Sequence, residues 1–183
     1  TGKLITTILR PGRRIRGSEA AAMLKRVLDH LLMVWPRVRT CLRGDSHFSA
    51  PEVHDPCDEY GIDFILGQAV NKKLNALGAP LMEQAAALAE ETEKPVRLFT
   101  EFEYQAASWS RPRQVIYKAE ITQGKANPRF VVTNIPNRTP RFLYERVYCA
   151  RGRMEGFVKN HKPSCTPTAP PAIVLQPDVP PVL

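Results

Sequence analysis

The sequence predicts an α/β fold, in which helices alternate with the strands of a partly parallel sheet. Short runs rich in β-branched residues alternate with segments whose apolar residues recur at the helical period of about 3.6. Turn-forming Pro and Gly residues separate these segments. The order helix, strand, helix, strand is typical of parallel strands joined by crossover helices.

Three runs predict the strands of the core: Lys3–Leu9, Val38–Leu42 and Ile62–Leu66. Two helices are expected between them. Ser18 is expected to cap the first, which Pro36 ends. The second should begin at a capping box, Ser49-x-x-Glu52, and end near Gly61. We expect residues 1–70 to form this partial core.

The second half predicts a helical linker and a β-rich insertion over residues 71–135. Asn71–Glu93 is rich in Ala, Leu and Glu, and it should form a helix that breaks near Gly78-Ala79-Pro80. Three strand-like runs follow: Val96–Tyr104, Gln114–Ile121 and Phe130–Asn134. Thr139-Pro140 should open a helix within residues 136–162. Prolines recur after Pro163, so residues 163–183 are expected to form a disordered tail.

The composition suggests a polyanionic partner. The 183 residues include 26 Lys and Arg against 18 Asp and Glu, a formal net charge of +8. Cationic residues gather within residues 3–39 and 129–162, a pattern typical of nucleic-acid binding as well as of an ordinary solvated surface. The four cysteines form no Cys-x-x-Cys pair, so no zinc site is predicted. No apolar stretch reaches membrane-spanning length.

A set of charged and aromatic residues follows helical spacing near the end of the chain. Tyr148, Arg151, Glu155 and Lys162 are separated by three, four and seven positions, which places them on one stripe of a helix. Such a stripe presents a carboxylate beside two cations. It could hold a divalent metal while the cations attract phosphate oxygens.

Asp45 is a second candidate metal ligand. It follows a predicted parallel strand, and open α/β sheets build their sites at the carboxyl ends of such strands. On its own, an Asp in this place is more often a turn or helix-start residue. Five motifs occur together in order: Trp35-Pro36-x-Val38-Arg39, Arg43-Gly44-Asp45-Ser46-His47-Phe48, Tyr60-Gly61-Ile62-Asp63-Phe64, Tyr148-Cys149-Ala150-Arg151-Gly152 and the Tyr-x2-Arg-x3-Glu-x6-Lys stripe.

These motifs resemble the DDE transposases encoded by bacterial insertion sequences, over about residues 2–162. The resemblance implies a ribonuclease H-like fold in which three carboxylates hold two Mg²⁺ (or Mn²⁺) ions for DNA cleavage and strand transfer. By position, Asp45 and Glu155 match two of those carboxylates. Tyr148, Arg151 and Lys162 match residues that contact the DNA end. The resemblance also implies a homodimer on transposon ends and a cytoplasmic, nucleoid-associated location in bacteria.

Three residues have alternative interpretations. Trp109 lies in an exposed-looking, basic segment, and related transposases stack an insertion tryptophan on a flipped base; ordinary packing in a β-subdomain is the alternative. His47, two residues after Asp45, could touch phosphate or metal-bound water, or serve as a hydrogen-bonding neighbour. A solvent-facing ion pair is the alternative for Glu155.

The first Asp of the family's triad has no match in this sequence, because the chain begins at Thr1, after the place of the strand that carries it. We therefore expect a truncated fragment, with the first core strands missing, that is inactive alone. Two other possibilities stay open. One is a split nuclease whose missing strand comes from another polypeptide, and the other is a non-catalytic, basic DNA-binding remnant.

Overall fold

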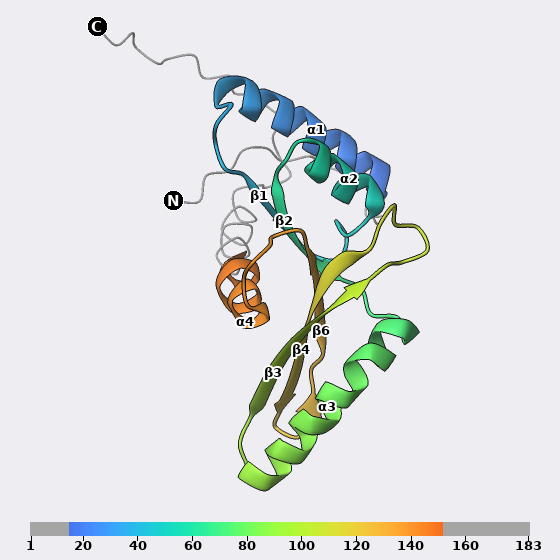
Figure 1. Ribbon diagram of the computed structural model, residues 1–183, viewed down its shortest axis with the longest axis vertical. Helices are drawn as coiled ribbons and strands as arrows, with labels where there is room; N and C mark the ends of the chain where they lie inside the picture. The colour runs from blue at the N-terminus through green and yellow to red at the C-terminus, as the bar shows by residue number, and fades with distance from the viewer. Residues whose placement is uncertain (1–14, 152–183) are drawn as a thin grey trace, which may run out of the picture. The chain divides into compact units, whose positions relative to one another are not determined.

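The computed structural model describes residues 15–151, in which one mixed sheet has helices on both faces (Figure 1). The six strands follow the order β1-β2-β6-β4-β3, with β5 paired to β4. This arrangement is α/β, as predicted. It is compatible with part of a nuclease-like core. The predicted strand Lys3–Leu9, Glu155, Lys162 and the proline-rich segment 163–183 lie outside the described residues.

The first half of the described chain forms two helix–strand units. Their elements are α1 (Gly17–Val34), β1 (Cys41–Gly44), α2 (Pro51–Glu59) and β2 (Asp63–Gln68). Strands β1 and β2 pair in parallel, with Cys41 opposite Asp63. Helix α1 ends just before Trp35-Pro36, and Gly61 follows α2 with a φ of 63°, a conformation that glycine adopts without strain. These features confirm the predicted alternation and both helix ends.

The predicted helix starts and the first strand boundary need correction. Ser18 lies inside α1, whose N-cap is Arg16, and the Arg16 amide donates a hydrogen bond to the Glu19 carboxylate at 3.3 Å. The capping box at Ser49 is also absent, because α2 begins at Pro51 with Ala50 as its N-cap. The Ser49 hydroxyl instead donates to the Gln68 side chain at the end of β2. Strand β1 starts at Cys41, three residues later than the predicted start.

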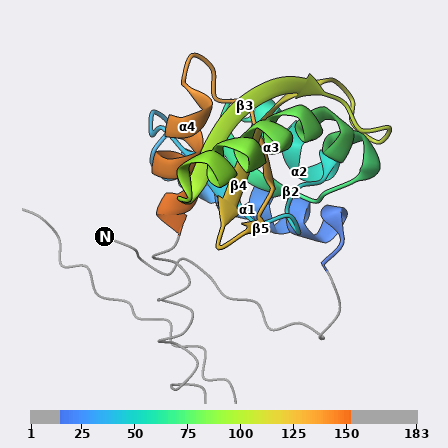
Figure 2. The ribbon, with the colours of Figure 1, turned by 90° about the horizontal axis from the view of Figure 1, so that it is seen from below.

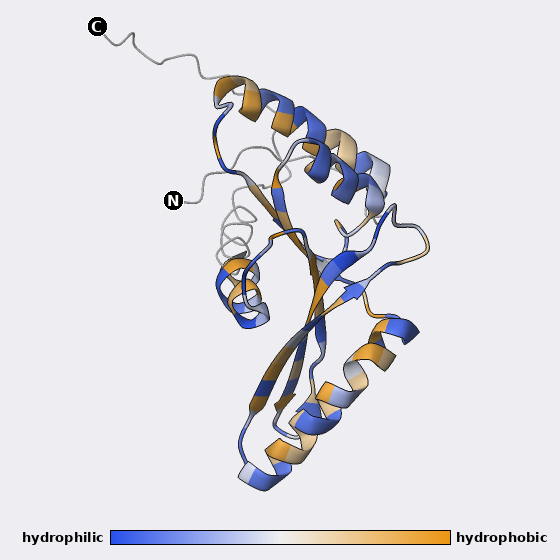
Figure 3. Ribbon diagram, in the orientation of Figure 1, coloured by the Kyte–Doolittle hydropathy of each residue, from blue (hydrophilic) through white to orange (hydrophobic). Residues whose placement is uncertain are grey.

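Helix α3 (Lys72–Thr92) is continuous, so the predicted break near Gly78-Ala79-Pro80 is wrong. Gly78 is buried against the ring of Tyr117, where an added Cβ would lie 2.7 Å from Cζ. The glycine therefore allows close contact between helix and sheet, and Pro80 occupies an exposed position. Figure 3 shows hydrophobic and hydrophilic residues intermixed along α1 and α3, as expected for helices with one face on a sheet.

The remaining strands extend the same sheet. They are β3 (Val96–Tyr104), β4 (Arg113–Thr122), β5 (Lys125–Ala126) and β6 (Arg129–Thr133). Strand β6 pairs antiparallel with β2, and β4 pairs with both β6 and β3. The predicted strand runs are thus confirmed, and the β-rich segment joins β2 through β6. Figure 2 shows the long, curved β3, which is the outermost strand on this side of the sheet.

The two faces of the sheet are buried by different helices. Residues such as Phe64, Leu66 and Val115 pack in the core shared with α1, α2 and α3. On the opposite face, Ile65, Ile116 and Val131 pack against a second helical segment that contains Leu143 and Tyr144. Figure 1 shows this segment, labelled α4, and α3 on opposite sides of the strands. Strand alternation explains the division, since successive side chains point to opposite faces.

The segment that carries Tyr148 begins as predicted and then departs from regular α-helix. Thr139 caps α4 (Pro140–Phe142) by accepting a hydrogen bond from the Phe142 amide at 3.3 Å. The chain continues as a π-helix, η1 (Leu143–Tyr148), and a 3₁₀ turn, η2 (Cys149–Arg151). The Cys149 amide bonds to the Tyr144 carbonyl, five residues back. Tyr148 and Arg151 therefore do not follow the uniform α-helical spacing from which the stripe was predicted.

Candidate active site

Asp45 lies at the carboxyl end of β1, where the sequence places it. Its side chain is 39% exposed, and its Oδ1 accepts a hydrogen bond from the His47 amide at 3.0 Å. The His47 ring lies against the same oxygen, with Nδ1 at 3.3 Å. His47 is therefore a hydrogen-bonding neighbour of Asp45. The turn orders the carboxylate and leaves part of it accessible to solvent.

Tyr148 meets the same end of the sheet. Gly67, near the carboxyl end of β2, is buried, and a Cβ placed on it would lie 2.8 Å from the Tyr148 hydroxyl. The same Cβ would lie 3.1 Å from the Ser46 amide nitrogen and 3.4 Å from the Asp45 carbonyl carbon. The structure thus brings the Tyr148 hydroxyl and the Asp45–Ser46 backbone, which are far apart in sequence, close to the same glycine.

Arg43 connects β1 directly to the segment that carries Tyr148. Its Nη1 donates a hydrogen bond to the Val147 carbonyl at 3.1 Å. No role for Arg43 is predicted from sequence, where its only signal is its place in the run Arg43-Gly44-Asp45. Of the other predicted residues, Arg151 is described by its backbone alone, and Glu155 and Lys162 lie beyond the described range.

Trp109 is buried, in agreement with the alternative of ordinary packing, although its polar neighbours give the segment an exposed-looking sequence. It is 6% exposed, and its ring makes edge-on contacts with His54 at 5.3 Å and Tyr104 at 5.4 Å between centroids. A long loop after β3 folds back onto α2, which explains why a polar local sequence carries a core residue. Stacking of this ring on a flipped base would require it to leave the core.

An ion-pair network centred on the buried Arg113 holds α2, the helix that follows the Asp45 turn, against β4. The Arg113 side chain is 3% exposed and pairs with Asp55 at 2.9 Å and Asp58 at 2.8 Å. Burial by itself would raise the pKa of Asp58, but hydrogen bonds from Arg113 and Arg111 lower it below the ordinary value. The network fixes α2, and hence one side of the Asp45 turn.

Metal-ligating side chains are sparse in the described region. Within residues 15–151, no three His, Cys, Asp or Glu side chains lie close enough to hold a metal ion. Burial raises the pKa of Cys57 to about 12, so this thiol stays protonated at neutral pH. Asp45 supplies one carboxylate for Mg²⁺, which prefers oxygen ligands and keeps several waters. The other predicted carboxylate, Glu155, lies beyond the described residues.

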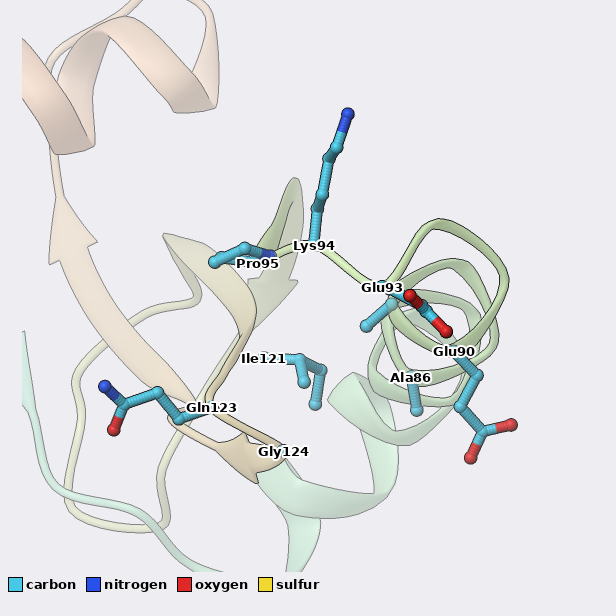
Figure 4. Close-up of a pocket in the computed structure, with 9 residues that line it drawn as sticks. Ala86, Glu90, Glu93, Lys94, Pro95, Ile121, Gln123 and Gly124 are labelled. Atoms are coloured by element: carbon cyan, nitrogen blue, oxygen red, sulfur yellow. The ribbon is translucent and has the colours of Figure 1, made fainter.

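An open hollow of about 470 Å³ lies elsewhere, between the end of α3 and the β4–β5 turn (Figure 4). Ala86 and Ile121 form part of its wall, and Figure 4 shows the Lys94 side chain extending away from it. It lacks a cluster of converging polar groups. The end of β1 is therefore the stronger candidate site. No helix within residues 15–151 combines the length and apolar character needed to cross a membrane.

A carboxylate at the end of a parallel strand, faced by a tyrosine-bearing helical segment, is compatible with the core of a nuclease-like α/β protein. The chain belongs to the family described as Transposase DDE domain group 1, which matches residues 1–168. This match includes the Asp45 turn and the whole Tyr148–Lys162 stripe. Comparison with curated proteins and with solved structures gave no significant match. Family membership implies a DNA substrate and transposition-related nuclease chemistry.

Proposed function

We propose that this chain provides part of a site for metal-dependent cleavage and strand transfer of DNA at the ends of a bacterial insertion sequence. The observation that carries the proposal is the partly exposed Asp45 carboxylate at the end of β1, where the Tyr148 hydroxyl and the Asp45–Ser46 backbone both lie close to Gly67. Family membership supports the same chemistry. A ribonuclease H-like core, extended through β6, is the fold we propose for it.

Asp45 and Glu155 are the proposed metal ligands, and both would act as ionised carboxylates. The bound Mg²⁺ or Mn²⁺ would supply Lewis-acid activation of the attacking oxygen and neutralise charge on the phosphate. Tyr148, Arg151 and Lys162 are proposed to hold the DNA end. The His47–Asp45 hydrogen bond supports this arrangement by fixing the orientation of one metal-binding carboxylate.

Two matched carboxylates leave the family's three-carboxylate set incomplete. We therefore propose that the 183-residue chain cleaves weakly or not at all unless another polypeptide supplies the third carboxylate. The net charge of +8 supports a second candidate, DNA binding without chemistry. In the complete enzyme we propose a homodimer that holds both transposon ends.

A strand-nicking assay separates these functions. The purified chain is incubated with supercoiled plasmid in Mg²⁺ or Mn²⁺, as wild type and as Asp45→Asn and Glu155→Gln. Glu103→Gln is the matched control, since Glu103 is an exposed carboxylate on the edge strand β3 and its loss changes the net charge equally. Nicking lost in the first two variants and kept in the control supports catalysis.

The same variants are titrated with labelled DNA at several salt concentrations. Salt-sensitive binding that is equal in all variants, with no nicking, supports the DNA-binding function instead. Wild-type protein that neither nicks nor binds DNA at low salt would contradict both functions. Nicking that survives in both carboxylate variants would remove Asp45 and Glu155 from the site.

A further inference from the structure

The hydrogen bond from Arg43 to Val147 joins the two halves of the proposed site. Arg43 lies opposite Ile65 in the β1–β2 pairing, so the two side chains share one face of the sheet. Ile65 packs in the cluster that contains Leu143 and Tyr144. Arg43 therefore lies on the face that the Tyr148 segment covers, and Asp45 follows it by two residues.

The winding of this segment makes the contact significant. Residues Leu143–Tyr148 form a π-helix, which contains about one more residue per turn than an α-helix. The extra residue changes which side chains face the sheet. Arg43 bonds to the carbonyl of Val147, within the π-wound turn and directly before Tyr148. Isolated π-turns are uncommon and need support from surrounding contacts.

A second anchor holds the start of the same segment. Glu145 pairs with Arg97 of β3 at 3.3 Å and with Arg141 at 3.2 Å. Arg97 also donates to Glu120 of β4 at 2.7 Å. Leu143, which is fully buried against the sheet, also lies at this end of the segment. Arg97 thus anchors the part of the segment before Val147, and Arg43 anchors its Tyr148 end.

We infer that Arg43 is a positioning residue for the proposed reaction: it holds the π-wound turn so that Tyr148 stays beside Asp45. The inference rests on the proposed function for its catalytic consequence, whereas the docking of the segment is independent of it. An arginine suits the role because its guanidinium presents several donors in a fixed plane, is always charged, and reaches a backbone carbonyl on a neighbouring element. Gly67 completes the arrangement by leaving room for the Tyr148 hydroxyl.

Hydrogen–deuterium exchange of the full chain tests the docking. The variants are Arg43→Met and Arg43→Gln, both of which lose the contact, with Lys125→Met as the control. Lys125 is an exposed cation in the short strand β5. We expect faster exchange in residues 143–151 of both Arg43 variants, unchanged exchange in residues 113–122, and no change in the control. Arg43→Lys should restore part of the protection.

Nicking kinetics provide the second readout. We expect the Arg43 variants to lose about 10- to 100-fold in kcat with KM for DNA changed less than about twofold, because misplacing a reacting group slows the step more than it weakens binding. Unchanged exchange in residues 143–151 of Arg43→Met would overturn the inference. The inference would also be overturned if exchange in both variants became faster in residues 113–122 by as much as in residues 143–151, since Arg43 would then stabilise the whole fold.

The two proposals fail in different ways. Nicking that survives in both Asp45→Asn and Glu155→Gln contradicts the proposed function, and the exchange comparison still decides whether Arg43 docks the segment. If Arg43→Met nicks DNA with the same kcat as the wild type, the positioning role is overturned and the proposed function is unaffected.

Discussion

His54 should make the protein sensitive to mild acid. This side chain is fully buried in α2, stacked on Phe64 at 5.1 Å and edge-on to Trp109. Within the described part of the chain, its Nδ1 has no hydrogen-bond partner. Burial, followed by the positive charge of Arg113, lowers the pKa of His54 from 6.5 to about 4. Protonation would place a cation in the core near Arg113, and Asp55 and Asp58 offset this cost only in part.

The size of the effect follows from the two pKa values. Lowering the pKa of His54 from 6.5 in the unfolded chain to about 4 in the folded chain corresponds to about 3 kcal/mol of the free energy of unfolding. The folded state binds the proton less tightly than the unfolded state. The contribution is therefore complete above pH 6.5, and it is lost as the pH falls from 6.5 to about 4.

Urea unfolding at pH 7.5 and 4.5, followed by far-ultraviolet circular dichroism, measures this loss. The matched variant is His54→Phe, which keeps an aromatic ring between Phe64 and Trp109 but cannot be protonated. Wild type should lose about 2 to 3 kcal/mol more than His54→Phe between the two pH values. Titration of Asp and Glu affects both proteins and cancels in the comparison. An equal loss in both proteins would refute the assignment of the acid sensitivity to His54.

Three other substitutions test the packing around the site. Gly67→Ala should displace Tyr148 and reduce nicking, with a loss of about 1–3 kcal/mol in urea unfolding; full activity would contradict the placement of the tyrosine. Arg113→Met should cost about 3 kcal/mol and raise the pKa of Asp58, measured by NMR titration, because the carboxylate loses a buried cation. Gly78→Ala should lower the melting temperature in calorimetry, although alanine favours helix, because its methyl group meets the tyrosine ring beneath; a higher melting temperature would count against that contact.

Local sequence patterns predicted most secondary structure because the propensity for helix or strand depends mainly on neighbouring residues. The β-branched runs at residues 96–104 and 114–121 are strands, with β3 confirmed at both ends. The helix at residues 71–93 is also present, but its continuity was missed. A Gly and a Pro in one turn predict a break, whereas the contact of Gly78 with Tyr117 offsets their unfavourable propensity. That contact joins residues 39 positions apart, so no local window contains it.

The candidate site likewise has features with a local sequence signal and features that depend on distant contacts. Asp45 could be predicted from sequence because a strand followed by a charged turn is a local signal. The motif that relates it to the family, Arg43-Gly44-Asp45-Ser46-His47-Phe48, is also a run of consecutive residues. For Trp109 the polar neighbours left base stacking and ordinary packing both open, and the structure buries its ring against His54 and Tyr104. The role of Arg43 was not visible, since its partner is a backbone carbonyl 104 residues away.

The sequence by itself determined the α/β class, the strand-end carboxylate and the family, because each depends on short-range periodicity or on motifs in order. Only the tertiary structure decided that the β-rich segment extends the core sheet through β6, that the Tyr148 hydroxyl and the Asp45–Ser46 backbone meet at Gly67, and that Leu143–Tyr148 is a π-helix. These features depend on contacts between distant residues, whose free energy is settled only when the sheet has formed and its two faces have been covered.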